Sequence, residues 1–150
     1  MVQNVLGSDV VCQVAVVVED VEKVSEAWAK LLGVEVPDWS MTDPAEKSHI
    51  EYGGETTEAR AKLAFFDLGQ VRLEIIEPLG RPSTWGEFLD DHGQGLHHIA
   101  FFVEGMDEVL EELEEQGLAP VQRGDYTGGC YAYVDGISQL GCILELLENF

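Results

Sequence analysis

The chain has 150 residues, of which 29 are acidic and 8 are basic, so its formal net charge is −21. Apolar residues make up 45% and charged residues 25%, which fits a folded globular protein and excludes a wholly disordered acidic chain. No apolar run approaches the roughly 20 residues that span a bilayer. So negative a surface is also unsuited to phosphate backbones and anionic lipid. We therefore expect neither a membrane nor a nucleic acid as a partner.

The amino-terminal residues and the cysteines favour the cytoplasm. Residues 1–9 lack the basic and apolar regions of a signal peptide. Cys12, Cys130 and Cys142 form an odd set without CxxC spacing, which is typical of small buried thiols in a reducing compartment. We expect a cytoplasmic protein without a thiol-based site.

The first half of the chain predicts a strand, a helix and then further strands. A β-branched run over residues 10–18 is typical of a buried strand. Apolar residues at helical spacing follow over 21–32, and Gly33 ends that helix. Residues 37–57, rich in Pro, Asp, Ser, Gly and Thr, predict a long mobile connection. Three later strands are expected near residues 48–53, 61–67 and 70–77.

The second half repeats this order. Residues 98–103 predict a strand, and a helix with an apolar stripe follows from Met106 and stops at Gly117. Three more strands are expected near residues 119–123, 129–134 and 141–148. Between the halves, Ser83 is a plausible N-cap of a short helix that turns Trp85, Phe88 and Leu89 inward.

This repetition predicts an α+β fold made of two tandem βαβββ modules. The modules cover about 8–78 and about 95–150, and a linker of about 79–94 joins them into one domain spanning 1–150. Neither module would bury its sheet face alone. We therefore expect a pseudo-twofold, open barrel-like mixed sheet with the helices outside.

Four polar residues stand at matching places of the two predicted modules. Gln13 and His98 lie in the first strands, 85 positions apart, and Glu74 and Glu145 lie between apolar neighbours in the last strands. Each alone is more often a surface residue, but a charge facing a sheet interior is costly unless it is paired or bound to metal. The symmetry predicts that the four converge. One imidazole nitrogen and three oxygen donors suit a divalent ion such as Zn²⁺, Mn²⁺, Co²⁺ or Ni²⁺.

Two further patterns leave alternatives open. Five of the eight basic residues lie in the middle of the chain, either as scattered surface charges or as a cationic spot for an anionic small ligand: Lys47, Arg60, Lys62, Arg72 and Arg81. Residues 123–129 form either a flexible lid over the substrate or an exposed hairpin. The candidate substrate contacts are Lys62, Arg72, Arg81 and Tyr126. Because His97 and His98 are adjacent, we expect them on opposite faces, with only His98 in the site.

Four segments carry a resemblance to a known superfamily: residues 14–20, 73–78, 98–100 and 141–146. They resemble the vicinal oxygen chelate superfamily of glyoxalases, bleomycin resistance proteins and extradiol dioxygenases. Residues 74–81 and the run Gly95-Leu96-His97-His98 are most similar to the methylmalonyl-CoA epimerases. The resemblance implies one bound divalent metal, with His98, Glu74 and Glu145 as ligands, and a homodimer.

The resemblance also implies a reaction. It is an isomerisation or epimerisation in which a carboxylate removes a proton next to a carbonyl polarised by the metal, with Glu145 as the first candidate for the base and Glu74 as the second. Gln13 stands where epimerases usually have His, and the set Gln, Glu, His, Glu is similar to that of glyoxalase I. Residues 61–66 contain no acid, although some epimerases place a further carboxylate there. The alternatives are a glyoxalase-like lyase or another superfamily isomerase acting on a small hydroxy-carbonyl compound, and a metal-free binding protein of the resistance type.

Overall fold

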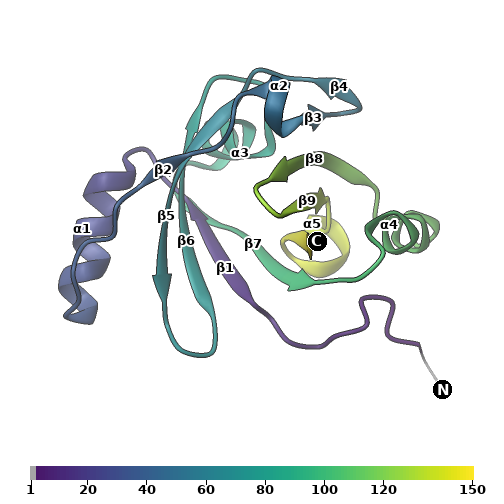
Figure 1. The fold of residues 1–150 in the computed structure, drawn as a ribbon, viewed down its shortest axis with the longest axis horizontal. Helices are drawn as coiled ribbons and strands as arrows, with labels where there is room; N and C mark the ends of the chain where they lie inside the picture. The colour runs from purple at the N-terminus through teal and green to yellow at the C-terminus, as the bar shows by residue number, and fades with distance from the viewer. Residues whose placement is uncertain (1–2) are drawn as a thin grey trace.

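A computed structural model describes residues 3–150, in which ten strands form one mixed, strongly curled sheet with helices around it (Figure 1). The helices are α1 (Val21–Leu32), α2 (Ala45–Ser48), α3 (Thr84–His92), α4 (Met106–Glu115) and α5 (Ile137–Leu140). The strands are β1 (Gln13–Val17), β2 (Ser40–Met41), β3 (Glu51–Tyr52), β4 (Glu55–Thr56), β5 (Arg60–Asp67), β6 (Arg72–Leu79), β7 (Gly95–Phe102), β8 (Pro120–Tyr126), β9 (Gly129–Val134) and β10 (Ile143–Asn149). Their order across the sheet is β2-β5-β6-β1-β7-β10-β9-β8-β3-β4. Among the described residues, no helix is both long enough and apolar enough to span a bilayer.

Strand pairing relates the two halves of the chain by an approximate twofold axis. β1 and β7 lie antiparallel at the centre, where Gln13 pairs with Ala100 and Ala15 pairs with His98. Gln13 and Ala15 correspond to His98 and Ala100, which lie 85 positions later in the second half. The twofold axis therefore relates the pair Gln13–Ala100 to the pair His98–Ala15. Each central strand has a parallel neighbour, β6 beside β1 and β10 beside β7. The predicted α+β class and the curled sheet of two repeated modules are confirmed.

Alternating side chains of the strands build the two faces of this sheet. On β1, Ala15 and Val17 are buried on the concave side, whereas Val16 packs toward α1 on the convex side. α1 covers β5 and β6, and α4 packs against β10, so both lie outside the curled sheet (Figure 1). α3 closes one end of the concave side with Trp85, and the predicted N-cap is confirmed because Ser83 Oγ accepts from Gly86 N at 3.0 Å.

The segment between α1 and β5 differs from the prediction of a strand over residues 48–53. Residues 45–48 form α2, and His49 then takes a left-handed conformation with φ 51°, so the chain bends before the short strand β3. β3 pairs with β8 of the second half, and β2 instead provides the second strand of the first module by pairing with β5. The predicted long connection, residues 37–57, therefore crosses from one half of the molecule to the other.

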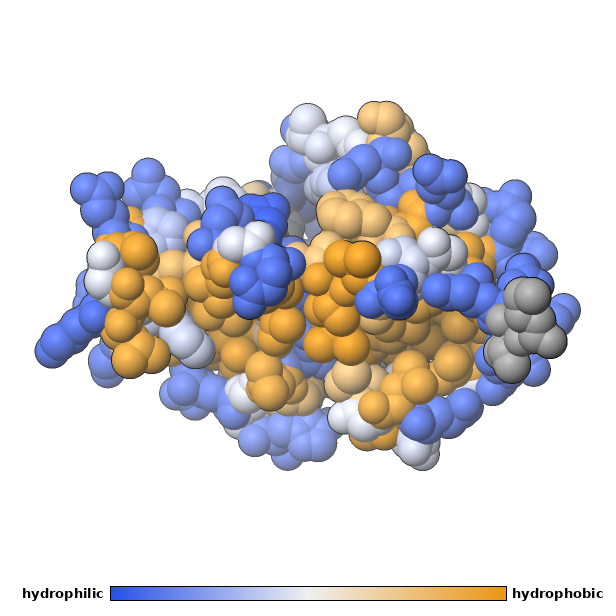
Figure 2. All heavy atoms as spheres, turned by 90° about the horizontal axis from the view of Figure 1, so that it is seen from below, coloured by the Kyte–Doolittle hydropathy of each residue, from blue (hydrophilic) through white to orange (hydrophobic). Residues whose placement is uncertain are grey.

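Several large apolar side chains stay exposed on the surface. Leu31 of α1 is 76% exposed, and Leu96 and Phe102 of β7 are 70% and 48% exposed. Seen from below, apolar atoms cover the side of α1 and the centre of the molecule, with hydrophilic residues around them (Figure 2).

Candidate metal centre

The strand register brings the two predicted glutamates onto the same side of the sheet as His98. Glu74 of β6 lies beside Ala15 of β1, and Glu145 of β10 lies beside Ala100 of β7. Both alanines are fully buried and end at Cβ. Their small size leaves the space above the two central strands to the longer carboxylate side chains.

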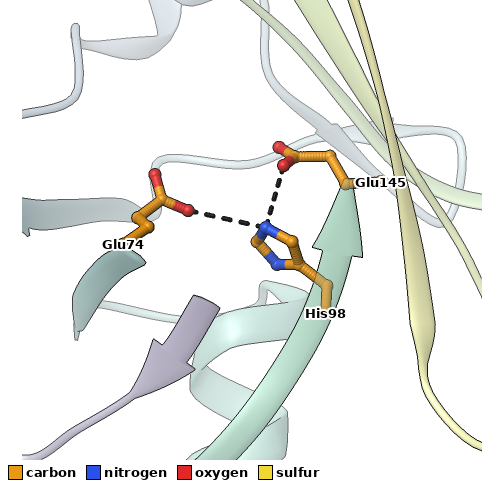
Figure 3. Close-up of side chains that lie close together, drawn as sticks. All are labelled: Glu74, His98 and Glu145. Atoms are coloured by element: carbon orange, nitrogen blue, oxygen red, sulfur yellow. Dashed lines mark ion pairs between the residues drawn. The ribbon is translucent and has the colours of Figure 1, made fainter. Parts of the chain in front are cut away.

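All four predicted ligands meet in this space. His98 Nε2 lies 2.8 Å from Glu145 Oε2 and 3.5 Å from Glu74 Oε1 (Figure 3). The same nitrogen lies 3.2 Å from Gln13 Oε1. Ligand atoms of Glu74, His98 and Glu145 fall within 4.8 Å of one another, and all of these residues are buried. The cluster could therefore hold a metal ion.

The two carboxylates lack the partners that buried charges need. Glu74 Oε1 and Glu145 Oε2 make no hydrogen bond within residues 3–150. Their only ion-pair partner in that range is the single imidazole of His98. An excess of buried negative charge is costly unless a cation compensates it. One nitrogen and three oxygen donors match the preferences of Zn²⁺, Mn²⁺, Co²⁺ or Ni²⁺, so the residues present fit such an ion.

Burial and proximity change the proton affinity of the cluster. Burial, followed by repulsion from Glu145, raises the pKa of Glu74 above the ordinary glutamate value. Burial lowers the pKa of His98, but attraction to Glu145 and Glu74 outweighs it, and the net pKa is raised. Without metal, both side chains therefore keep their protons to higher pH than usual.

Metal affinity is consequently expected to increase with pH. A divalent ion must displace the protons of Glu74 and His98, whose pKa values are both raised, so binding releases protons and weakens as the pH falls from about 8 to about 5. Calorimetric titration with zinc in buffers of different ionisation enthalpy measures both the affinity and the protons released. Glu74→Gln should reduce the number released. An affinity that does not change across this range would contradict the proposed ligands.

The doubled histidine is arranged differently from the prediction that the two rings face opposite sides. Nδ1 of His97 lies 2.8 Å from Nδ1 of His98, and both rings contact Tyr133. The cause is a β-bulge, because the pairing of β1 with β7 skips His97 and resumes with Leu96 opposite Val16. One Nδ1 must donate to the other. This contact orients the His98 ring with Nε2 toward the carboxylates.

The cluster borders a pocket of about 510 Å³, a size typical of small-molecule sites. Gln13, Glu74 and Glu145 line it, together with Trp85 from α3 and the connection around residues 40–50. Residues 125–127 at the tip of the β8–β9 hairpin also line it, so residues 123–129 form a hairpin that borders the pocket. Residues from both halves of the chain therefore line the pocket.

Two of the four predicted substrate contacts, Arg72 and Tyr126, line this pocket. Arg72 lies 3.3 Å from Asp67 and stacks on the ring of Phe65 at 4.1 Å. The hydroxyl of Tyr126 donates to Asn149 Oδ1 at 2.7 Å. Burial raises the pKa of Tyr126 to about 12, so this hydroxyl keeps its proton at neutral pH.

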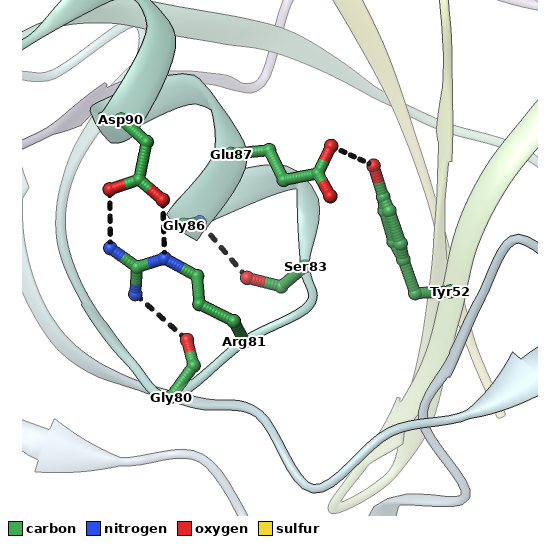
Figure 4. Close-up of polar contacts among 7 residues, drawn as sticks. All are labelled: Tyr52, Gly80, Arg81, Ser83, Gly86, Glu87 and Asp90. Carbon is green, nitrogen blue, oxygen red and sulfur yellow. Dashed lines mark hydrogen bonds and ion pairs between the residues drawn. The ribbon is translucent and has the colours of Figure 1, made fainter.

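The other two predicted contacts lie outside the lining of the pocket and are paired with acids. Lys62 Nζ lies 3.6 Å from Glu77. Arg81 donates two hydrogen bonds to Asp90, at 2.9 and 3.0 Å, beside the start of α3 (Figure 4). The predicted cationic spot therefore contributes one arginine, Arg72, to the pocket lining.

Tyr131 and Tyr133 line the pocket although the sequence pattern did not point to them. They alternate with buried small residues along β9, and Tyr133 pairs with Glu145 on the adjacent strand. Burial raises the pKa of both phenols, so both hydroxyls are protonated at neutral pH. The signal that could have identified them is the position of Tyr133 opposite Glu145, but this position is known only once the register of β9 and β10 is known.

Comparison with known proteins agrees with this architecture. Residues 12–134 match the family model of the Glyoxalase/Bleomycin resistance protein/Dioxygenase superfamily. The crystal structure of methylmalonyl-CoA epimerase from Mycobacterium tuberculosis is similar with a TM-score of 0.68, over 100% of this chain and 93% of that one. The two sequences are 19% identical, so this likeness concerns the fold.

Several curated proteins are similar to this chain in sequence. The uncharacterized protein YqjC of Bacillus subtilis is 37% identical over 94 residues, which are 61% of this chain and 67% of that protein. The human mitochondrial methylmalonyl-CoA epimerase is 28% identical over 104 residues, which are 69% of this chain. The match spans about half of the human protein, 51% of its length.

Proposed function

Because the chain belongs to the glyoxalase, bleomycin resistance protein and dioxygenase superfamily, we propose that it is a divalent-metal-dependent isomerase or epimerase that removes a proton next to a substrate carbonyl. The observation that carries this proposal is the buried cluster of Glu74, His98 and Glu145 at the edge of a small-molecule pocket, in which the imidazole of His98 is the only ion-pair partner of the two carboxylates within residues 3–150. Methylmalonyl-CoA is the first substrate to test, since the human relative is named as its epimerase.

Each residue of the centre has a role in this reaction. Gln13, Glu74, His98 and Glu145 would hold the ion, with Gln13 as a weak, exchangeable ligand. A bound divalent ion supplies polarisation of the carbonyl and stabilises negative charge on its oxygen. Glu145 takes the proton from the neighbouring carbon, with Glu74 as the second candidate for this role. Return of a proton to the opposite face gives the epimer, and return to a neighbouring carbon gives the isomer.

The amide of Gln13 supports a second candidate function. Its Oε1 lies 3.2 Å from His98 Nε2, so the cluster contains the Gln, Glu, His, Glu set that is similar to glyoxalase I. A glyoxalase-like lyase, or another isomerase of a small hydroxy-carbonyl compound, uses the same proton removal.

A homodimer is also part of the proposed function, and the exposed apolar side chains of Leu31, Leu96 and Phe102 support it.

Deuterium exchange separates the candidates. Metal-loaded protein is incubated in heavy water with methylmalonyl-CoA and, in parallel, with a hemithioacetal and a ketose-like compound, and each product is analysed by mass spectrometry. We expect deuterium at the carbon next to the carbonyl of methylmalonyl-CoA. Exchange confined to the hemithioacetal would assign the lyase. A protein that binds none of the four divalent ions would contradict the enzyme and favour the metal-free binding protein.

A further inference from the structure

The two halves of the sheet place different side chains beside the metal centre. On β5, Phe65 pairs with Glu74, and at the matching position of β9, Tyr133 pairs with Glu145. Two positions earlier on each strand, Leu63 of β5 and Tyr131 of β9 also occupy matching places. All four side chains line the pocket. The wall from the first half is therefore apolar, whereas the wall from the second half carries two phenol hydroxyls.

The hydrogen bond that reaches the hydroxyl of Tyr133 has a fixed direction. Trp85 Nε1 donates to it at 2.9 Å, and an indole N–H has no acceptor lone pair. Tyr133 Oη is therefore the acceptor in this bond, and its own proton is left to point elsewhere. Among residues 3–150, no group accepts that proton, and Tyr133 is 2% exposed.

The hydroxyl oxygen of Tyr131 is likewise the acceptor of a hydrogen bond. The backbone N–H of Thr84 donates to Gln122 Oε1 at 2.8 Å, which fixes the orientation of this buried amide. Gln122 Nε2 then donates to Tyr131 Oη at 3.1 Å. The proton of Tyr131 again finds no acceptor within the described part of the chain. Tyr126 differs, because its proton is already donated to Asn149.

We propose that Tyr131 and Tyr133 form a two-hydroxyl subsite that donates hydrogen bonds to an anionic oxygen of the substrate, a carboxylate or an enolate oxygen, beside the metal centre. Their ring centroids are 5.2 Å apart, and that of Tyr133 is 5.0 Å from the His98 ring, so the two rings lie next to each other beside the cluster. Leu63 and Phe65 face an apolar part of the same ligand. The subsite rests on the proposed function and identifies its substrate as a small carbonyl acid or enolate-forming compound.

This subsite explains how a chain with a net charge of −21 recognises an anion although the predicted cations Lys62 and Arg81 are paired elsewhere. Neutral hydroxyls donate strong hydrogen bonds to an anionic oxygen. They also leave the negative charge of Glu74 and Glu145 available to the metal. A lysine or arginine at either tyrosine position would instead compete with the ion for these carboxylates.

Zinc and oxalate are the probes for this subsite. The zinc-loaded protein is titrated with oxalate, a planar dianion that presents carboxylate oxygens, by calorimetry. Tyr131→Phe and Tyr133→Phe are each expected to lower the oxalate affinity about tenfold to hundredfold, the usual effect of losing a hydrogen bond to a charged group. Zinc affinity should stay unchanged. Tyr52→Phe is the matched control, because that hydroxyl donates to Glu87 outside the lining of the pocket and its loss should leave oxalate binding unchanged (Figure 4).

The outcomes separate the subsite from the proposed function. Normal zinc binding, with an oxalate affinity that ignores both substitutions, overturns the subsite and leaves the metal centre standing. Failure of the zinc-loaded parent to bind oxalate also overturns the subsite. Absence of zinc binding in the parent overturns the proposed function together with it. Thermal unfolding checks each fold, and the less buried Tyr131 decides the question if Tyr133→Phe does not fold.

Discussion

Replacing Glu145 with glutamine is expected to abolish turnover while leaving the metal in place. Glutamine keeps the size of the side chain and one oxygen donor, but it cannot take a proton from carbon. A positioned general base contributes about 10²–10⁴-fold, so kcat should fall by at least about that factor. Metal analysis of the same preparation checks that the ion is retained. His98→Ala, which removes the one nitrogen donor of the cluster, should lose the metal as well.

Glu74→Gln is the matched control, because the approximate twofold axis relates the two glutamates. If Glu145 is the base, this second variant keeps more activity. The opposite ranking would assign the base to Glu74, the second candidate for this role. Full turnover in both variants would contradict proton removal by either carboxylate.

Much of this centre could be predicted because the sequence contains its own repeat. In a duplicated strand, equivalent positions face the same side of the sheet, so the pairs Gln13 with His98 and Glu74 with Glu145 implied convergence without any knowledge of the strand order. The repeated order of elements and the turn residues likewise located β5 and β9 to within a residue of the predicted strands 61–67 and 129–134.

The parts that escaped prediction depend on contacts between segments without a repeated counterpart. β3 pairs with β8 across a long stretch of sequence, and only the fold brings the two together. The bulge at His97 breaks the alternation on which the prediction of opposite faces rested. The direction of the hydrogen bonds to Tyr133 and Tyr131 depends on Trp85 and Gln122, which lie on α3 and β8. No local pattern in β9 carries that information.

The metal-free protein is expected to lose stability as the pH rises. The raised pKa of Glu74 means that the folded state binds this proton more tightly than the unfolded chain, and the raised pKa of His98 acts in the same sense. The stability contributed by Glu74 is therefore fully present below the ordinary glutamate pKa of about 4.3 and is lost as the pH rises through the raised pKa. Urea unfolding of the metal-free protein at several pH values measures this loss.

Glu74→Gln isolates this effect from the repulsion among the many surface acids, which has the same sign. The amide stays neutral, so the variant without metal should become more stable than the parent by about 1–3 kcal/mol at alkaline pH, with a smaller difference in acid. Zinc at about one hundred times its Kd should stabilise the parent by about 2.7 kcal/mol, because it binds only the folded cluster. Parallel stability curves for parent and variant at every pH would show that Glu74 carries no buried charge. In that case the carboxylate would not need the cation that the centre is proposed to hold.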